Sequence, residues 1–347
     1  MSIKASEKEK IMIYLLNHID RNDRDYAIKT MQTFGVSRTT VTNYVKQLVK
    51  DQIIVSSCET ECGYELTCTI KIFSYSTSTK LEEDRIFNND ILPLVVHLSP
   101  NTRDILRYVF TEMMNNAIEH SSASTIQCTV IMSFLNTGIM INDDGIGIFK
   151  KIQDYFANKG ENISIDEAVE ALFPGKLTTD EKNHSGEGIF FSSRAADAFG
   201  ILSSGKLFAH NNFNERIIDI TDIEYAGTTN GTCVVLQVAN NSPKRIKDVF
   251  DMYSNAERGF FKTQIPIAHM FSSGYPVSRS EARRLATLVS GFEEITLDFK
   301  DVPEIGQAFT HELFVVFQNQ HPEIIMNTVN TCKDVDDMIT RVKNTKR

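Results

Sequence analysis

The sequence lacks any long uninterrupted apolar segment. No stretch of its 347 residues approaches the roughly 18 to 20 apolar residues that a helix needs to cross a bilayer. The N-terminal MSIKASEKEK is charged and lacks the apolar core of a secretory signal peptide. We therefore expect a cytoplasmic protein without a membrane partner.

Cysteine and basic residues are also in short supply. The six cysteines are spread along the chain instead of forming a dense disulfide framework, which suits a reducing compartment. Lys and Arg number 36 against 45 Asp and Glu, giving a net charge of −9. Residues 1–60, however, hold nine basic and seven acidic side chains. This basic head on an acidic chain favours a nucleic-acid contact near the N-terminus.

The N-terminal segment shows a helical periodicity of apolar residues. Apolar spacing predicts helices around residues 11–18 and 27–34, followed by a third helix over Arg38–Lys50 with Ser37 as its N-cap. The third helix should bury Val41, Val45 and Leu48. It should expose polar side chains that can bond phosphates and base edges, namely Arg38, Thr39, Thr40, Thr42, Asn43 and Lys46.

Two strand-like runs, IIVSS and ELTCTIKIF, follow this helix and predict a hairpin. The whole arrangement over about residues 5–75 resembles a bacterial winged helix-turn-helix. The resemblance implies a DNA-binding domain at residues 1–75 that reads DNA with the third helix. The alternative is a helical module for dimerisation or docking. The polar stretch that begins near Ser74 predicts a linker, placed at residues 76–88.

Helices and strands alternate over the next segment, residues 89–245, and three motifs stand out in it. A predicted helix at residues 103–120 places Glu112 and Asn116 on one stripe, which could equally be a solvated polar face. A strand then runs into the turn at residues 143–147, Asp-Asp-Gly-Ile-Gly. Finally, Gly186-Glu-Gly188 opens another helix, where backbone N–H groups could hold a polyphosphate.

The order and spacing of these motifs resemble the GHKL ATPase superfamily, which includes gyrase, heat-shock chaperones and histidine kinases. The resemblance implies a Bergerat-type α/β sandwich ATPase with ATP and Mg²⁺ as cofactors. In that family Asn116 would hold Mg²⁺, Asp143 would accept a hydrogen bond from the adenine amino group, and Glu112 would polarise the attacking water or hydroxyl.

The remaining roles follow from the same resemblance. Residues 149–185 would form a lid in which Lys182 and His184 are candidates for a γ-phosphate contact, whereas Lys176 fits a solvated loop better. Thr232 would complete the site. Gly145 and Gly147 would let the backbone reach the nucleotide, and Gly186 and Gly188 would cradle its phosphates.

The C-terminal segment, residues 260–347, predicts a small α/β domain. Ser278 and Glu281 form a capping box that opens a helix, and ITLDF predicts a strand. The segment resembles a STAS-like domain, kin to the anti-anti-sigma factors. In those proteins the loop corresponding to Ile305–Ala308 carries a phosphorylatable serine, but here it contains no hydroxyl. A docking or dimerisation domain is therefore expected, with a protein partner or a second copy.

Two functions follow from the predicted multidomain α/β architecture. The first is an ATP-binding transcriptional regulator whose ATPase domain gates DNA or partner binding. The alternative is a serine/threonine kinase of the anti-sigma-factor partner-switching type. A self-phosphorylating histidine kinase is disfavoured, because no phosphoacceptor helix pair precedes the ATPase motifs and His120 belongs to the first of them.

Overall fold

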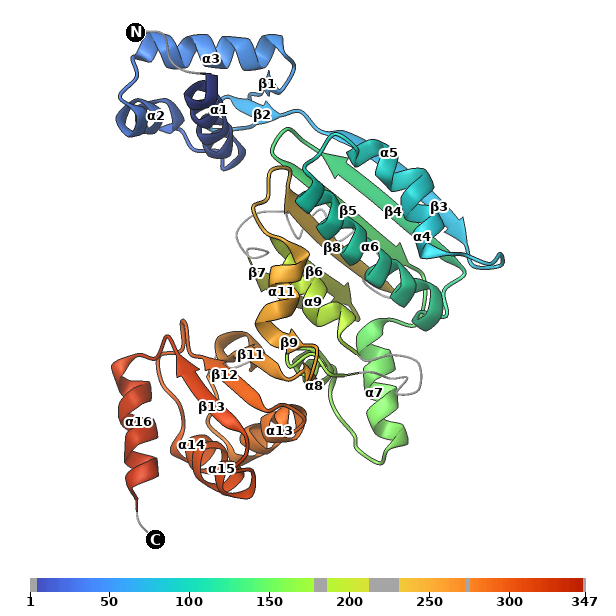
Figure 1. The fold of residues 1–347 in the computed structure, drawn as a ribbon, viewed down its shortest axis with the longest axis vertical. Helices are drawn as coiled ribbons and strands as arrows, with labels where there is room; N and C mark the ends of the chain where they lie inside the picture. The colour runs from blue at the N-terminus through green and yellow to red at the C-terminus, as the bar shows by residue number, and fades with distance from the viewer. Residues whose placement is uncertain (1–4, 178–185, 212–230, 272–274, 346–347) are drawn as a thin grey trace.

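The protein is a mixed α/β molecule with several sheets. We analysed a computed structural model that describes residues 5–177, 186–211, 231–271 and 275–345. A helical N-terminal unit, a central unit built on a large sheet and a C-terminal unit follow one another along the long axis (Figure 1). Within these ranges no helix is both long and apolar enough to span a membrane.

The N-terminal unit forms from the helices that the apolar spacing predicts. They are α1 (Ala5–Asp20), α2 (Tyr26–Phe34) and α3 (Arg38–Lys50). Ser37 caps α3, since its side chain accepts a hydrogen bond from the Thr40 N–H at 3.2 Å. Val41, Val45 and Leu48 are buried, as expected. A short antiparallel pair, β1 (Ile54–Ser56) and β2 (Tyr64–Leu66), follows.

The predicted hairpin forms between β1 and β2, but its second strand is shorter than predicted. The run that was expected to complete it continues past Thr67 as β3 (Thr69–Ser76), which pairs with β4 of the central sheet over its whole length. The reason lies in its side chains, because Phe73 and Tyr75 pack against the core of the central unit and not against the N-terminal helices. The expected linker is also partly structured, since it contains the helical turn α4 (Glu83–Ile86).

The central unit contains a six-stranded antiparallel sheet in the order β3-β4-β5-β8-β6-β7. Helices α6, α9 and α11 contact one another and pack on one face of it. After β3 and α4 its elements are η1 (Phe87–Ile91), α5 (Leu92–Val95), α6 (Pro100–His120), β4 (Thr125–Met132), β5 (Asn136–Asp143), α7 (Ile148–Asn158), α8 (Ile165–Glu170), α9 (Gly188–Ala195), β6 (Ala198–Ser203), β7 (Lys206–Asn211), β8 (Thr232–Ala239) and α11 (Ile246–Tyr253).

Strands β6 and β7 are the part of this sheet that the sequence analysis did not name. They form a tight hairpin whose two turn residues, Ser204 and Gly205, have φ values of 50° and 69°. Such left-handed pairs match the right-handed twist of flanking strands. The segment RIIDITDI, which the sequence offered as a strand, lies outside the described residues.

The C-terminal unit is built on a parallel sheet of three strands in the order β11-β12-β13. Ser278 and Glu281 form both halves of the predicted capping box at the start of α13. The first strand, β11, was not anticipated. The elements are β9 (Ser254–Asn255), β10 (Gly259–Phe260), β11 (Lys262–Pro266), α12 (Ile267–Met270), α13 (Arg279–Val289), β12 (Glu294–Asp298), α14 (Gln307–His311), η3 (Glu312–Phe317), α15 (Gln318–Gln320), β13 (Ile325–Val329) and α16 (Lys333–Asn344).

Candidate functional site

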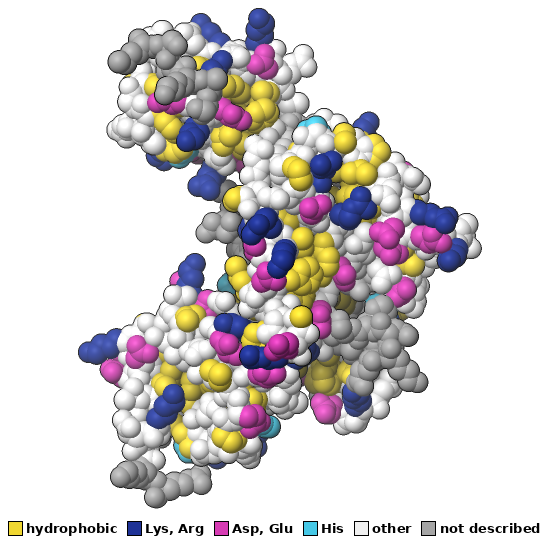
Figure 2. Space-filling view, in the orientation of Figure 1, with side chains coloured by type: hydrophobic (Ala, Val, Ile, Leu, Met, Phe, Trp, Pro, Cys, Tyr) yellow, Lys and Arg dark blue, Asp and Glu magenta, His cyan; other side chains and the backbone are white. Residues whose placement is uncertain are grey.

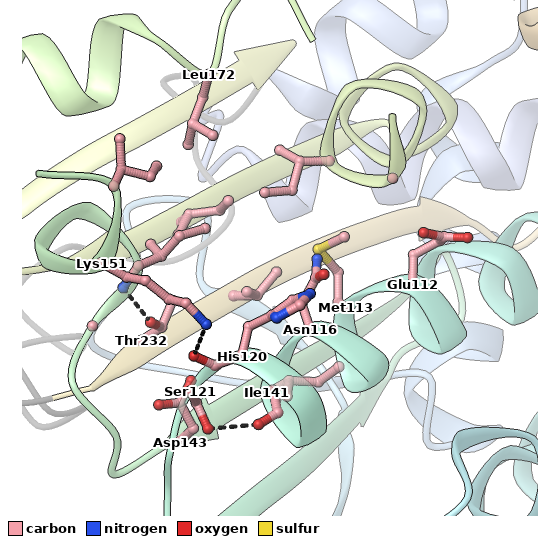
Figure 3. A pocket seen from close by; sticks show the side chains of 18 of the residues that line it. Glu112, Met113, Asn116, His120, Ser121, Ile141, Asp143, Lys151, Leu172 and Thr232 are labelled. Carbon is pink, nitrogen blue, oxygen red and sulfur yellow. Dashed lines mark hydrogen bonds between the residues drawn. The ribbon is translucent and has the colours of Figure 1, made fainter. Parts of the chain in front are cut away.

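One pocket in the central unit is lined by residues from all of the motifs that the sequence analysis singled out (Figure 3). The motifs lie up to about 120 positions apart in the chain, and α6, β5, α7, α9 and β8 bring them together. The predicted site residues that line it are Glu112, Asn116, Asp143, Gly147, Gly186, Gly188 and Thr232.

Helix α6 supplies Glu112 and Asn116. Its apolar stripe, which includes Phe110, Met113 and Ala117, is buried against the rest of the central unit. Because residues four apart lie on one side of a helix, this packing turns Glu112 and Asn116 together toward the pocket. Both side chains are partly buried and line the pocket.

The turn after β5 places a buried carboxylate in the pocket. Asp143 is only 5% exposed, and its Oδ1 accepts a hydrogen bond from the Gly145 N–H at 2.9 Å. Burial raises the pKa of Asp143 above its usual range, while the hydrogen bonds from Gly145 and Thr232 act in the opposite direction. Gly145 itself does not line the pocket; a Cβ atom there would lie 2.1 Å from the Ser121 carbonyl oxygen.

The chain segments at residues 147 and 231–232 meet beside Asp143. The Ile148 N–H donates to Thr232 Oγ1 at 3.0 Å, which joins the start of α7 to β8. Gly231 has a φ of +94°, and a Cβ there would lie 1.9 Å from the Asp143 carbonyl oxygen. Glycine is therefore required at 231 for steric as well as conformational reasons. From the sequence, the neighbouring Thr232 was named as a site residue but Gly231 was not.

The predicted Gly-x-Gly does open a helix, α9, whose first residue is Gly188. A Cβ on Gly188 would lie 2.2 Å from Glu112 Oε2, so the glycine allows α6 and α9 to approach closely at the pocket. Glu187, between the two glycines, also lines the pocket, and burial raises its pKa.

The three residues considered for the lid, Lys176, Lys182 and His184, differ in whether the structure describes them. Lys182 and His184 lie outside the described residues. Lys176 is a partly exposed loop residue that does not line the pocket; its Nζ donates to the Gly291 carbonyl at 2.7 Å and lies 4.3 Å from the centre of the Phe292 ring. Lys176 thus contacts the C-terminal unit.

Lys151 is a pocket residue that sequence reasoning missed. Its Nζ donates to the His120 carbonyl at the end of α6, at 2.7 Å (Figure 3). The signal was available, because Ile148, Lys151 and Ile152 are spaced to share one side of a helix that starts directly after Gly147. The pocket also has an apolar wall, formed by Met113, Ile141, Ile148, Ile152, Leu172, Leu177, Ile189, Ile201 and Val234.

A second candidate surface is the outer side of α3, which lies at the far end of the N-terminal unit from the central sheet (Figure 1). Five of the six predicted contact residues are exposed: Arg38, Thr39, Thr42, Asn43 and Lys46. The sixth, Thr40, is partly buried and takes part in the Ser37 cap. On the face drawn in Figure 2, Lys and Arg side chains of this unit are scattered among acidic and apolar ones.

Comparison with known proteins identifies the C-terminal unit. Residues 281–336 match the family described as "STAS-like domain of unknown function (DUF4325)". This match confirms the predicted C-terminal STAS-like domain. The search of curated proteins returned no match.

Within this domain, Thr310 is the first hydroxyl residue along the chain after the loop at residues 305–308, and it is not accessible for phosphorylation. Thr310 is fully buried, and its Oγ1 donates to the Gly306 carbonyl at 2.8 Å. A Cβ on Gly306 would lie 2.5 Å from the Val277 carbonyl oxygen, so the loop is packed tightly against the residues before α13.

Proposed function

We propose that the chain is an ATP-binding, DNA-binding transcriptional regulator. The central unit is a Mg²⁺-dependent ATPase domain of the GHKL type, and the N-terminal unit is a winged helix-turn-helix. In this proposal nucleotide in the central pocket gates the binding of DNA or of a protein partner. The observation that carries it is the convergence of the three sequence motifs and Thr232 on one pocket.

The residues present fit a Mg²⁺-bound nucleoside triphosphate. The buried Asp143 offers a hydrogen-bond acceptor next to an apolar wall, as a purine with an exocyclic amino group requires. Gly186 and Gly188 line the pocket at the start of α9 and carry no side chains of their own, so their backbone can approach phosphate oxygens. The Asn116 carboxamide oxygen is a hard ligand of the kind Mg²⁺ prefers.

The proposed roles of the acidic residues differ. Asp143 binds and orients the base, so it acts in affinity. Glu112 lies at the other end of the α6 stripe, beside Gly188, where it can hold the proton of an attacking water. Mg²⁺, when bound, would offset the charge of the phosphates.

For the kinase alternative, the loop at residues 305–308 of the STAS-like domain is not a suitable phosphoacceptor. The loop at residues 305–308 carries no hydroxyl, and Thr310 is buried and hydrogen-bonded. A phosphoacceptor would therefore have to lie elsewhere, in another part of this chain or in another protein. Incubation with labelled ATP and candidate partners tests this, and a labelled partner above background would favour the kinase.

Asp143→Asn tests the pocket assignment. An asparagine oxygen can still accept from the Gly145 N–H, so the turn should persist, but the carboxylate is lost. We expect nucleotide affinity, measured by isothermal titration calorimetry, to fall at least tenfold, since a hydrogen bond to a charged group contributes about 1.5 to 3 kcal/mol. Unchanged affinity would refute the assignment.

Two further variants complete this experiment. Asp144→Asn is the matched control, because Asp144 is the exposed neighbour that bonds Ser124 and does not line the pocket. Glu112→Ala should bind nucleotide but lose turnover by about 10² to 10⁴. DNA mobility-shift assays on the same proteins show whether nucleotide gates DNA binding.

A further inference from the structure

The wall of the pocket on the side of the C-terminal domain is made by two segments, residues 165–177 and 186–195. Both face two ways. In the first segment Leu172 and Leu177 line the pocket, while Pro174 and Lys176 between them contact the STAS-like domain. In the second, Gly188 lines the pocket and Arg194 contacts the same domain.

Helix α8, at the start of the first segment, lies near α13 (Figure 1). An ion pair joins the two helices. Arg284 Nη1 lies 3.0 Å from Glu167 Oε1, and Arg284 Nε lies 3.5 Å from Glu170 Oε2. The Glu167 side chain is 25% exposed, so solvent screens its ion pair with Arg284 less than it would at an open surface.

The rest of the first segment is anchored by hydrogen bonds to the carboxyl-terminal domain. Thr263 Oγ1, fully buried in β11, donates to the Pro174 carbonyl at 2.9 Å. Two residues later, Lys176 Nζ donates to the Gly291 carbonyl at 2.7 Å. These bonds leave the backbone of residues 174–176 little freedom relative to the STAS-like domain.

The second segment joins the same domain through α9. Arg194 Nη2 donates to the Gln264 carbonyl of β11 at 2.9 Å, and its guanidinium lies 3.3 Å from the centre of the Phe190 ring. Phe190 in turn packs on Phe260, with ring centres 4.6 Å apart. The two wall segments also touch, because a Cβ on Gly175 would lie 2.3 Å from the Phe190 ring.

We propose that the STAS-like domain acts on its own chain by holding this wall in place, with Arg284 as a positioning residue for the pocket. The inference rests on the proposed nucleotide-binding function and deepens it. The docked domain raises nucleotide affinity, and by thermodynamic reciprocity bound nucleotide strengthens the docking. The partner of this face of the domain is therefore the ATPase unit of the same chain.

Arg284→Ala in the full chain tests the proposal, with Arg283→Ala as the matched control. Arg283 is its neighbour on α13 but pairs with Glu312 inside the C-terminal domain, at 2.6 Å. The dissociation constant for a non-hydrolysable ATP analogue with Mg²⁺ is measured by calorimetry. We expect Arg284→Ala to weaken binding about fivefold or more, and Arg283→Ala to leave it within twofold.

A double-mutant cycle with Glu167→Gln separates positioning from a general loss of structure. Glutamine keeps a side-chain oxygen that can accept the hydrogen bond from the Ser164 N–H in the capping box of α8. It removes the negative charge that faces Arg284. The double variant should bind no more weakly than Arg284→Ala alone, because both changes break one interaction. Additive losses would overturn the assignment to this ion pair.

The remaining outcomes are also decisive. If wild type binds the analogue and Arg284→Ala binds it equally well, the coupling is refuted while the nucleotide function stands. If wild type and Asp143→Asn both fail to bind, the proposed function fails and the coupling fails with it. Protection of the 165–177 peptide from hydrogen exchange should rise on nucleotide binding in wild type and rise less in Arg284→Ala.

Discussion

At the scale of single residues, close approaches decide what the pocket tolerates. Gly188 and Gly231 stand where a Cβ would meet Glu112 Oε2 or the Asp143 carbonyl within about 2 Å. The two sites differ in what must move. At Gly188 the neighbour is the end of a flexible side chain, whereas at Gly231 it is backbone. Substitution at 188 should thus affect chemistry, and substitution at 231 should affect folding.

Gly188→Ala is predicted to keep the fold and lose turnover. The added methyl must displace the Glu112 carboxylate from its position beside α9. We expect ATPase activity to fall about 10²-fold, the lower end of what a general base contributes, with a melting temperature near that of wild type. Gly138→Ala is the control, since its Cβ would meet only ordinary contacts, the nearest at 3.5 Å. Equal activities in the two variants would contradict the role of Glu112.

Glu170 is predicted to make stability depend on pH. Burial raises its pKa from 4.5 to about 7 despite Arg284. The folded state then holds the proton more tightly than the unfolded state. This contribution to stability is complete below pH 4.5 and is lost as the pH rises to about 7.

The measurement is urea unfolding at pH 5 and pH 7.5 for wild type and Glu170→Gln. Between these values wild type should lose up to about 3 kcal/mol of unfolding free energy relative to the variant. Glu161→Gln, at an exposed position, controls for the loss of one acidic group. Parallel pH profiles for wild type and Glu170→Gln would show that Glu170 is not the responsible group.

At the scale of elements, α3 combines a buried apolar stripe with an outer side on which Arg38, Asn43 and Lys46 are exposed. Its N-cap and its burial pattern are both local properties, which is why the sequence predicted them. Strand β3 shows the opposite case. Its alternation was recognised, but its pairing partner depends on tertiary contacts, because the paired residues of β4 lie 49 to 63 positions further along the chain.

Lys46→Ala tests α3 as the DNA-reading element. If Lys46 contacts a phosphate, the slope of log affinity against log salt concentration for a mixed-sequence duplex should become shallower by about 1. Arg24→Ala removes one positive charge from the same unit, but outside α3, where Arg24 pairs with Glu61 at 3.0 Å. An identical slope for all three proteins would favour a docking or dimerisation role for α3.

At the scale of the whole molecule, the three units are joined by different means. The chain passes from the N-terminal unit to the central sheet through two residues, Thr67 and Cys68, and Leu135 of the central unit packs against the N-terminal core. The C-terminal unit instead shares a continuous hydrophobic core with the central unit, including Phe191 and Phe260 at 5.1 Å. A change in the central unit can therefore reach both neighbours, by a short covalent connection on one side and by packing on the other.

If nucleotide gates DNA binding, the coupling must be reciprocal. A non-hydrolysable ATP analogue should change DNA affinity about 5- to 150-fold, and DNA should change analogue affinity by the same factor. Fluorescence anisotropy measures the first quantity and calorimetry the second. Asp143→Asn serves as the control in which the analogue should have no effect. If the analogue leaves both DNA affinity and oligomeric state unchanged in wild type, the gating proposal is wrong.

The sequence by itself determined what depends on near neighbours: the helices, their caps at Ser37 and Ser278, and the glycine-rich turns at residues 143–147 and 186–188. It also identified the C-terminal STAS-like domain. Only the tertiary structure decided which motifs share a pocket, that Lys151 joins it, that β3 belongs to the central sheet, and that Lys176 and Arg284 tie its wall to the next domain. The physical reason is that local preferences depend on side chains a few positions apart, whereas pairing and burial depend on residues the chain brings together from a distance.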